Sequence, residues 1–189
     1  MRITGRSNNQ EDRFHRLAWP QMSTLLRTAG YLTRDPHAAE DLVQETMIRA
    51  MKNMASFEDG TDIRAWLMTI MRRTHIDLYR ADRKHRAVLS LEAADGLRIT
   101  LPDERDTGVY DDQWDKPEEL LERFGDEVVV LALKTLPEDI RWTLLLVDVE
   151  QMDHADAASI LNVPVGTIKS RPHRGRAMLR DRLHLHAAS

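Results

Sequence analysis

Cationic and hydroxyl side chains are concentrated in the segment 165–183, where they could donate hydrogen bonds to phosphates and to base edges. Apolar and small residues recur in this segment at steps of three and four, which predicts a helix with one buried stripe. The predicted stripe consists of Val165, Ile168, Pro172, Gly175, Leu179 and Leu183. The remaining face carries Thr167, Lys169, Ser170, Arg171, His173, Arg174 and Arg176.

A short helix and a tight turn are predicted directly before this segment. The helix is indicated by the amphipathic pattern of Asp156, Ala157, Ala158, Ile160 and Leu161. Residues 162–166 interrupt that pattern, and Pro164 suits the first turn of the following helix, where its missing N–H would have no partner in any case. Two helices joined in this way are typical of a helix-turn-helix, so the sequence predicts DNA binding.

The formal net charge of −4 hides a segregated pattern. Residues 63–86 carry seven Lys and Arg against two Asp and Glu, and residues 164–184 carry six against one. Residues 87–127 carry four against thirteen. Two basic blocks separated by an acidic one indicate two nucleic-acid contact sites joined by a solvated connector, although one basic block by itself would equally suit a hydrated helix face.

Helical periodicity dominates the first half of the chain. One pattern covers residues 11–32 and has a break or kink at Pro20. A second helix is expected to begin with Asp35 as its cap and Pro36 as its first residue. A third is expected from Ile63 onward, after the loop 57–62.

Residues 87–125 lose this periodicity and hold many acidic side chains, which predicts a flexible linker. Helical patterns resume near Asp126 and again after Pro137, and no strand pattern occurs in the sequence. We therefore expect an all-α protein. Its two small helical domains, at 11–86 and 126–184, would be joined by the acidic linker 87–125 and preceded by a flexible N-terminus at 1–10.

The composition excludes several kinds of site. The chain has no cysteine, which excludes disulfides, thiolate zinc sites and cysteine nucleophiles. It has no phosphate-binding glycine loop and no HExxH motif, and its eight histidines are scattered, so we expect no enzyme, no cofactor and no metal site. No apolar run reaches the roughly 20 residues that span a bilayer, and no signal-peptide core is seen. We expect a cytoplasmic protein without membrane insertion.

Four motifs in order resemble the extracytoplasmic-function (ECF) sigma factors, which belong to the sigma-70 family of bacterial RNA polymerase. The motifs are Asp41-Leu42-Val43-Gln44-Glu45-Thr46, then Ala65-Trp66-Leu67 with Ile70, Asp77 and Arg80, then Leu136-Pro137, and finally Val165-Gly166-Thr167-Ile168-Lys169-Ser170-Arg171. The resemblance implies a noncatalytic, dissociable subunit that directs core RNA polymerase to promoters and assists the melting of promoter DNA. It also implies sigma region 2 at 11–86, sigma region 4 at 126–184, and an anti-sigma factor as a further partner.

The resemblance implies three contact surfaces. The surface for core polymerase consists of Asp41, Gln44, Glu45 and Ile48. The surface for the minus-10 element consists of Arg64, Arg72, Arg73, His75, Tyr79, Arg80 and Arg83, with the loop 56–62 cradling a flipped base. The surface for the minus-35 element consists of Thr167, Lys169, Ser170, Arg171, His173, Arg174 and Arg176. Trp66 is expected in the core rather than stacked on a base.

Two other functions fit part of the pattern. A stand-alone helix-turn-helix regulator would leave the residues 41–45 and the first basic block unexplained. The second is a sigma mimic that sequesters an anti-sigma factor. Such a protein needs no DNA contacts, so the basic faces of both domains argue against it. Two departures from the family pattern keep this alternative open: Arg73 stands where relatives usually carry Asn, and Pro172 where they usually carry a larger aliphatic residue. The acidic linker resembles the family's connector through the RNA path of the polymerase and would serve equally as a soluble tether.

Replacement of Pro172 by leucine tests the proline in the predicted recognition helix. Proline cannot donate to the carbonyl of Ile168, and inside a helix it costs about 3 kcal/mol and usually bends the axis. Pro172→Leu should therefore raise the melting temperature and alter the affinity for minus-35 DNA, because the predicted bend near residues 170–171 would be lost. Thermal denaturation and DNA titration measure both effects, and equal stability of the two proteins would contradict the hypothesis.

Overall fold

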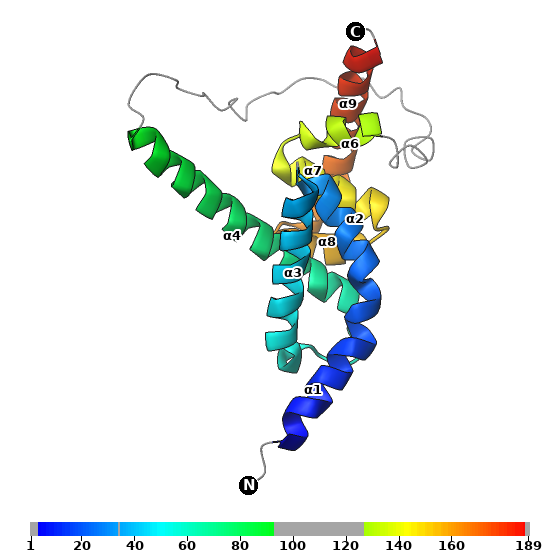
Figure 1. Ribbon diagram of the computed structural model, residues 1–189. Helices are drawn as coiled ribbons and strands as arrows, with labels where there is room; N and C mark the ends of the chain where they lie inside the picture. Colours follow the sequence, from blue (N-terminus) through cyan, green and yellow to red (C-terminus); the bar gives the residue numbers. More distant parts are fainter. Residues whose placement is uncertain (1–3, 34, 93–126, 188–189) are drawn as a thin grey trace.

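The computed structural model describes the backbone of residues 4–33, 35–92 and 127–187, and every regular element in these ranges is a helix. Figure 1 shows the helices of the first half of the chain lying beside those of the last third. No helix among the described residues is long and apolar enough to cross a membrane. The predicted all-α class is confirmed.

Proline breaks the first helical pattern as expected. Helix α1 (Thr4–Leu17) is followed by the 3-10 turn η1 (Trp19–Gln21) and then by α2 (Met22–Leu32). Pro20 lies within the 3-10 turn, where its fixed φ fits and its missing N–H disrupts the α-helical ladder. Helix α1 begins at Thr4, upstream of the expected start at Glu11.

Aspartate caps begin the next two helices. The side chain of Asp35 accepts a hydrogen bond from the N–H of Ala38 at the start of α3 (Pro36–Lys52). The 3-10 turn η2 (Met54–Ser56) and a loop then lead to α4 (Ile63–Glu92), where a carboxylate oxygen of Asp62 accepts from the N–H of Arg64 at 2.7 Å. Helix α4 extends into the first residues of the predicted linker, and most of that linker lies outside the described residues.

The described residues 127–187 form four α-helices. They are α6 (Glu127–Lys134), α7 (Glu138–Leu144), α8 (His154–Leu161) and α9 (Val165–Ala187), and the π-helical turn η4 (Leu145–Val149) follows α7 directly. Helix α9 continues through Pro172, whose side chain is buried, so the proline does not end the helix.

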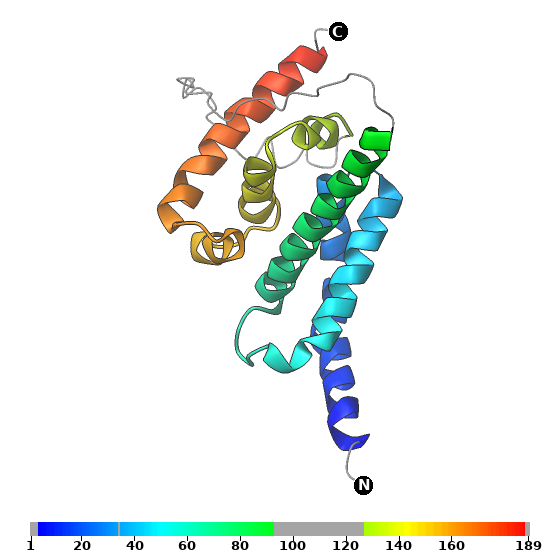
Figure 2. The ribbon, with the colours of Figure 1, turned by 90° about the vertical axis from the view of Figure 1, so that its left-hand side faces the viewer.

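Helix α4 lies between the two halves. Figure 2 shows α3 on one side of it and the C-terminal helices on the other. Leu67, Met68 and Met71 of α4 are fully buried, and the buried side chains of both halves form one continuous hydrophobic cluster. Burial of Thr74 in this region is compensated because its hydroxyl donates to the carbonyl of Ile70 at 2.9 Å.

The predicted buried stripe of α9 is confirmed at four of its six positions, and Leu183 is half-buried. Ile168, Pro172, Gly175 and Leu179 are buried, but Val165 is 41% exposed. Val165 is the first residue of the helix, and the apolar spacing alone assigned it to the wrong environment.

Two glycines provide a matched test of this packing. A Cβ at Gly175 would lie 2.9 Å from Cγ2 of Ile140 and 3.0 Å from Cδ2 of Leu144, both buried side chains of α7, whereas a Cβ at Gly30 in α2 would meet nothing within 4 Å. Gly175→Ala should lower the free energy of unfolding by about 1–2 kcal/mol through overpacking. Gly30→Ala should raise it by about 0.5–1 kcal/mol through helix propensity. Urea denaturation measures both, and stabilisation by Gly175→Ala would contradict the close approach of α9 to α7.

Candidate nucleic-acid interface

The turn between α8 and α9 is built by local hydrogen bonds. The side chain of Asp153 caps α8 by accepting from the N–H of Asp156 at 2.8 Å. Asn162 ends the helix in the left-handed conformation, with φ of 54°, which asparagine tolerates better than most residues. The N–H of Thr167 then donates to the carbonyl of Pro164 at 2.9 Å and begins α9. The predicted helix-turn-helix is present.

The outward face of α9 carries only part of the predicted minus-35 surface. Lys169, Ser170, His173 and Arg174 are exposed, and Thr167 is half-buried near the start of the helix. The hydroxyl of Ser170 donates to the carbonyl of Thr167 at 3.2 Å, so it is held along the helix. In helix-turn-helix proteins in general, the exposed face of the second helix is the one that enters the major groove.

Two of the predicted DNA-contacting arginines instead bind carboxylates of their own half of the molecule. Arg176 donates from Nε and Nη2 to the two carboxylate oxygens of Asp148, at 3.0 and 2.6 Å, and Asp148 is only 6% exposed. These hydrogen bonds raise the pKa of Arg176 above its ordinary value. Arg171 is half-buried and lies 3.0 Å from a carboxylate oxygen of Asp139. The geometry gives Arg176 a role in holding α9 to η4.

Helix α4 presents the predicted minus-10 residues in two environments. Arg73, Tyr79 and Arg80 are exposed, and the Tyr79 ring, at 48% exposure, is accessible for stacking. Arg64 and Arg72 are half-buried on the side toward the C-terminal helices. The side chain of Arg83 lies outside the described residues. Trp66 is half-buried against the core, with its ring centroid 5.3 Å from that of Phe57, in agreement with its expected packing role.

Arg13 holds the loop that precedes α4, a role that the sequence did not indicate. Its guanidinium donates to the carbonyls of Met54 and Phe57 at 3.1 and 2.7 Å and to the carboxylate of Asp59 at 2.6 Å. It also lies 5.2 Å from the centre of the Phe57 ring, within cation–π range. The conformation of the loop 56–62 therefore depends on a side chain of α1.

The inner side of α4 contacts acidic residues of the C-terminal half. Nδ1 of His75 lies 3.2 Å from Oε1 of Glu138, and the His75 ring lies edge-on to Trp142. The hydrogen bond with His75 holds the pKa of Glu138 below its ordinary value, against the opposing effect of burial. Nη1 of Arg64 donates to the backbone carbonyl of Glu150 at 2.8 Å.

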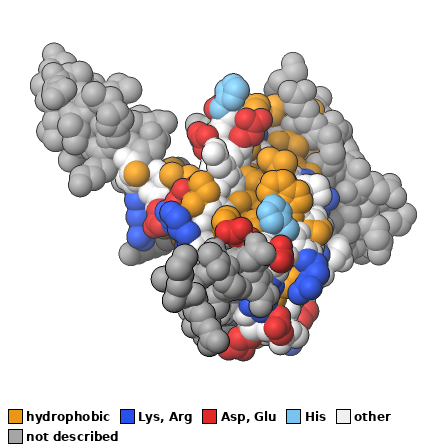
Figure 3. Space-filling model, turned by 60° about the horizontal axis from the view of Figure 1, so that its bottom comes forward, with side chains coloured by type: hydrophobic (Ala, Val, Ile, Leu, Met, Phe, Trp, Pro, Cys, Tyr) orange, Lys and Arg blue, Asp and Glu red, His pale blue; other side chains and the backbone are white. Residues whose placement is uncertain are grey.

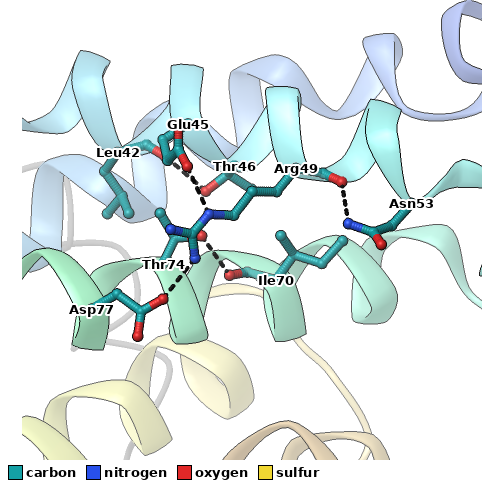
Figure 4. Close-up of polar contacts among 8 residues, drawn as sticks. All are labelled: Leu42, Glu45, Thr46, Arg49, Asn53, Ile70, Thr74 and Asp77. Atoms are coloured by element: carbon teal, nitrogen blue, oxygen red, sulfur yellow. Dashed lines mark hydrogen bonds and ion pairs between the residues drawn. The ribbon is translucent and has the colours of Figure 1, made fainter.

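The predicted core-polymerase surface lies on α3. Asp41 and Gln44 are exposed, and Ile48 is 40% exposed beside them along the helix. Glu45 differs, because its carboxylate accepts from Nε of Arg49 at 2.7 Å, and Arg49 also binds Asp77 of α4 at 2.7 Å (Figure 4). Both carboxylates raise the pKa of Arg49. Glu45 thus braces α3 against α4 as well as facing solvent.

The face of the molecule drawn in Figure 3 carries charges of both signs. Figure 3 brings the bottom of the molecule forward and shows hydrophobic side chains gathered between acidic, basic and histidine side chains. Among the described residues no group of three or more His, Cys, Asp or Glu is placed to hold a metal ion.

Both halves of the chain are similar to known proteins. The family descriptions "Sigma-70 region 2" and "Sigma-70, region 4" match residues 22–85 and 126–179. The ECF RNA polymerase sigma factor EcfG of Rhodopseudomonas palustris is 37% identical over 159 residues, which are 83% of this chain and 77% of EcfG. The ECF RNA polymerase sigma factor SigE of Mycolicibacterium smegmatis is 32% identical over 86% of this chain, which spans 58% of SigE.

A solved structure agrees with these sequence matches. The sigma factor RpoE from Bartonella quintana, in complex with the anti-sigma factor NepR, is 28% identical and superposes with a TM-score of 0.66. The match covers 91% of this chain and 97% of that one. The similarity therefore extends over both halves of the molecule.

Replacement by alanine should change the free energy of unfolding differently for an arginine that holds the fold and for a cation that faces solvent. Arg176→Ala should lower the free energy of unfolding by about 3 kcal/mol, because it leaves the buried carboxylate of Asp148 without its partner. Lys169→Ala should leave stability within about 0.5 kcal/mol, because the side chain is exposed. Denaturant unfolding of the two variants provides the comparison, and equal stabilities would contradict the structural role of Arg176.

Proposed function

The chain belongs to the ECF sigma factors of the sigma-70 family, and we propose that its three contact surfaces act together when it directs core RNA polymerase to promoters. In this proposal α3 binds the polymerase, α4 and the loop 56–62 bind the minus-10 element, and α9 binds the minus-35 element. The observation that carries the assignment is the presence of two separate cation-bearing helices, α4 and α9, together with the acidic and apolar face of α3.

We assign DNA contacts to the side chains of α9 and α4 that are exposed. On α9 we assign Lys169 and Arg174 to the DNA, with Thr167 and Ser170 near the phosphates. Arg176 would act indirectly by fixing the helix. On α4 the exposed Arg73 and Arg80 supply positive charge, and Tyr79 supplies a stacking surface, which is the combination that binds single strands.

The polymerase would supply the catalytic chemistry in this scheme. The chain itself would act through binding energy alone, in the cytoplasm where the polymerase works. A stand-alone helix-turn-helix regulator is not supported, because the family match includes residues 22–85 as well as α8 and α9. The exposed cations of both α4 and α9 argue against a sigma mimic, since a decoy has no need of DNA contacts.

An anti-sigma factor is a further proposed partner. The similar RpoE structure contains the anti-sigma factor NepR, and its match covers most of this chain. A protein of that class would then regulate this sigma factor by binding.

Run-off transcription tests the proposed function. Purified bacterial core polymerase is given a pooled genomic template with and without the protein, and protein-dependent transcripts are sequenced. Asp41→Lys should abolish both core binding and transcripts, because it reverses an exposed charge on α3 without disturbing the core. Lys169→Ala should retain core binding and reduce the transcripts at least several-fold.

Asp12→Lys provides the matched control, because Asp12 is equally exposed but lies on α1. It should leave core binding and transcription unchanged. The absence of both transcripts and core binding for the unaltered protein would contradict the proposal.

A further inference from the structure

The loop 56–62 has hydrogen bonds of its own, but these do not place it relative to the rest of the molecule. Gly60 has a φ of 94°, in the left-handed region that favours glycine, and residues 58–62 are exposed. The N–H and the hydroxyl of Thr61 donate to the carbonyl of Glu58 at 3.2 and 2.7 Å. These bonds close a turn and leave its position to be set by contacts with other parts of the chain.

Arg13 supplies such contacts from α1, at separations of 41 to 46 residues in sequence. Its guanidinium binds the carbonyls of Met54 and Phe57, where the chain enters the loop, and the exposed carboxylate of Asp59 within the loop. Both ribbon views place η2, which precedes the loop, beside α1 (Figures 1 and 2). One planar group with several donors thus fixes the backbone of the loop and one of its side chains.

The start of α4 fixes the other end of the loop. A carboxylate oxygen of Asp62 accepts from the N–H of Arg64, which holds the last loop residue against the helix. The exposed residues between Phe57 and Asp62 are therefore presented from two fixed ends, and one of these ends depends on Arg13.

Arg13 is itself poorly placed to contact DNA. Its side chain is 19% exposed, whereas that of Asp59 is 84% exposed. Its guanidinium is occupied by three acceptors and by the face of the Phe57 ring. Residue 13 also precedes the residues 22–85 that match the description of sigma-70 region 2. An effect of this side chain on promoter recognition must therefore act through the loop.

Recognition of an extruded base depends on the position of the loop that receives it. Such a base is recognised by hydrogen bonds to its Watson–Crick edge and by stacking. Donors and acceptors that are held within about half an ångström of the required position can distinguish one base from another. A flexible loop, by contrast, can rearrange to accept several bases.

We propose that Arg13 is a positioning residue for minus-10 recognition, which sets the base preference of the loop 56–62 by holding the loop in one conformation. The inference rests on the proposed binding of the minus-10 element by α4 and this loop. Helix α1, to which the proposed function assigns no contact, thereby contributes to minus-10 specificity without touching DNA.

The loop is acidic, so loss of Arg13 should also weaken the binding of every DNA sequence. Glu58, Asp59 and Asp62 all lie within residues 58–62, and Arg13 compensates the charge of Asp59. The guanidinium of Arg64 lies 3.9 Å from the carboxylate of Asp62. A general loss of affinity lowers the output of all promoters together. The informative quantity is therefore the ratio of outputs between promoters that differ in one base.

A barcoded promoter library measures that ratio. The strongest promoter from the run-off assay is randomised at its minus-10 positions, and a barcode in the transcribed region identifies each template. Core polymerase with the unaltered protein, Arg13→Gln or Arg16→Gln transcribes the pool, and the barcode counts in the RNA are divided by those in the DNA. Arg16→Gln is the matched control, because it makes the same change at an exposed position of α1.

The unaltered protein should prefer one base by roughly five-fold or more at the position that the loop contacts. Arg13→Gln should reduce this preference to about two-fold or less, because the loop can then adapt to other bases. Preferences at the remaining minus-10 positions should be unchanged in Arg13→Gln, and Arg16→Gln should retain the preference at every position.

A spin label tests whether the effect acts through the loop. The chain has no cysteine, so Glu58→Cys provides a single attachment site on the exposed part of the loop. The electron paramagnetic resonance spectrum of the label should narrow when Arg13→Gln is added, because the loop then moves more freely. Addition of Arg16→Gln should leave the spectrum unchanged.

Several outcomes would overturn the inference. They are a retained base preference in Arg13→Gln, an equal loss in Arg16→Gln, equal flattening at every minus-10 position, flattening without a change in the motion of the label, and an unaltered protein with no minus-10 preference. If Arg13→Gln fails to fold by circular dichroism, Arg13→Lys decides. Its ammonium keeps the charge but lacks the planar fork, so the base preference should fall by about two-fold or more, and full retention would overturn the inference.

The run-off assay separates this inference from the proposed function. Transcripts from the unaltered protein with core polymerase, together with an intact base preference in Arg13→Gln, would overturn the role of Arg13 alone. The absence of transcripts and of core binding would contradict the proposed function itself.

Discussion

Helix α4 packs against both halves of the molecule, and the other described helices are arranged around it. Its buried residues Leu67, Met68 and Met71 contribute to the hydrophobic cluster, while Asp77 binds the arginine that braces α3. Its cations lie on the remaining sides. Arg64 and Arg72 are half-buried, at the boundary between the packed and the charged sides of the helix.

The arginines of this protein fall into two groups that composition does not separate. Arg13, Arg49 and Arg176 bind carboxylates or carbonyls and fix the loop 56–62, the α3–α4 contact and the η4–α9 contact, respectively. Others, such as Arg73 and Arg80, are exposed. A guanidinium presents several donors in a fixed plane, so it suits both roles, and the neighbouring acceptors decide which role it takes.

Contacts of Glu150 help to hold the two halves of the molecule together. Glu150 combines an ion pair, a neutral hydrogen bond and a backbone contact in one nearly buried place. Removal of one partner lowers the free energy of unfolding by more than the contact contributes, because the remaining charge is buried with neither water nor its partner. The packing of the two halves therefore depends in part on these contacts of Glu150.

The helical class, the positions of most helix starts, the helix-turn-helix and the family could all be predicted from the amino-acid sequence. These features depend on local signals: the Asp35–Pro36 and Asp62 caps, the break at Pro20, and the three- and four-residue apolar steps of α9. Only the tertiary structure decided which cations are available. Arg176 and Asp148, or Glu150 and Arg27, lie far apart in sequence, and their pairing depends on how helices cross, which no periodicity encodes. The misplaced Val165 has the same origin, because a pattern indicates which face of a helix is apolar but not where its neighbours end.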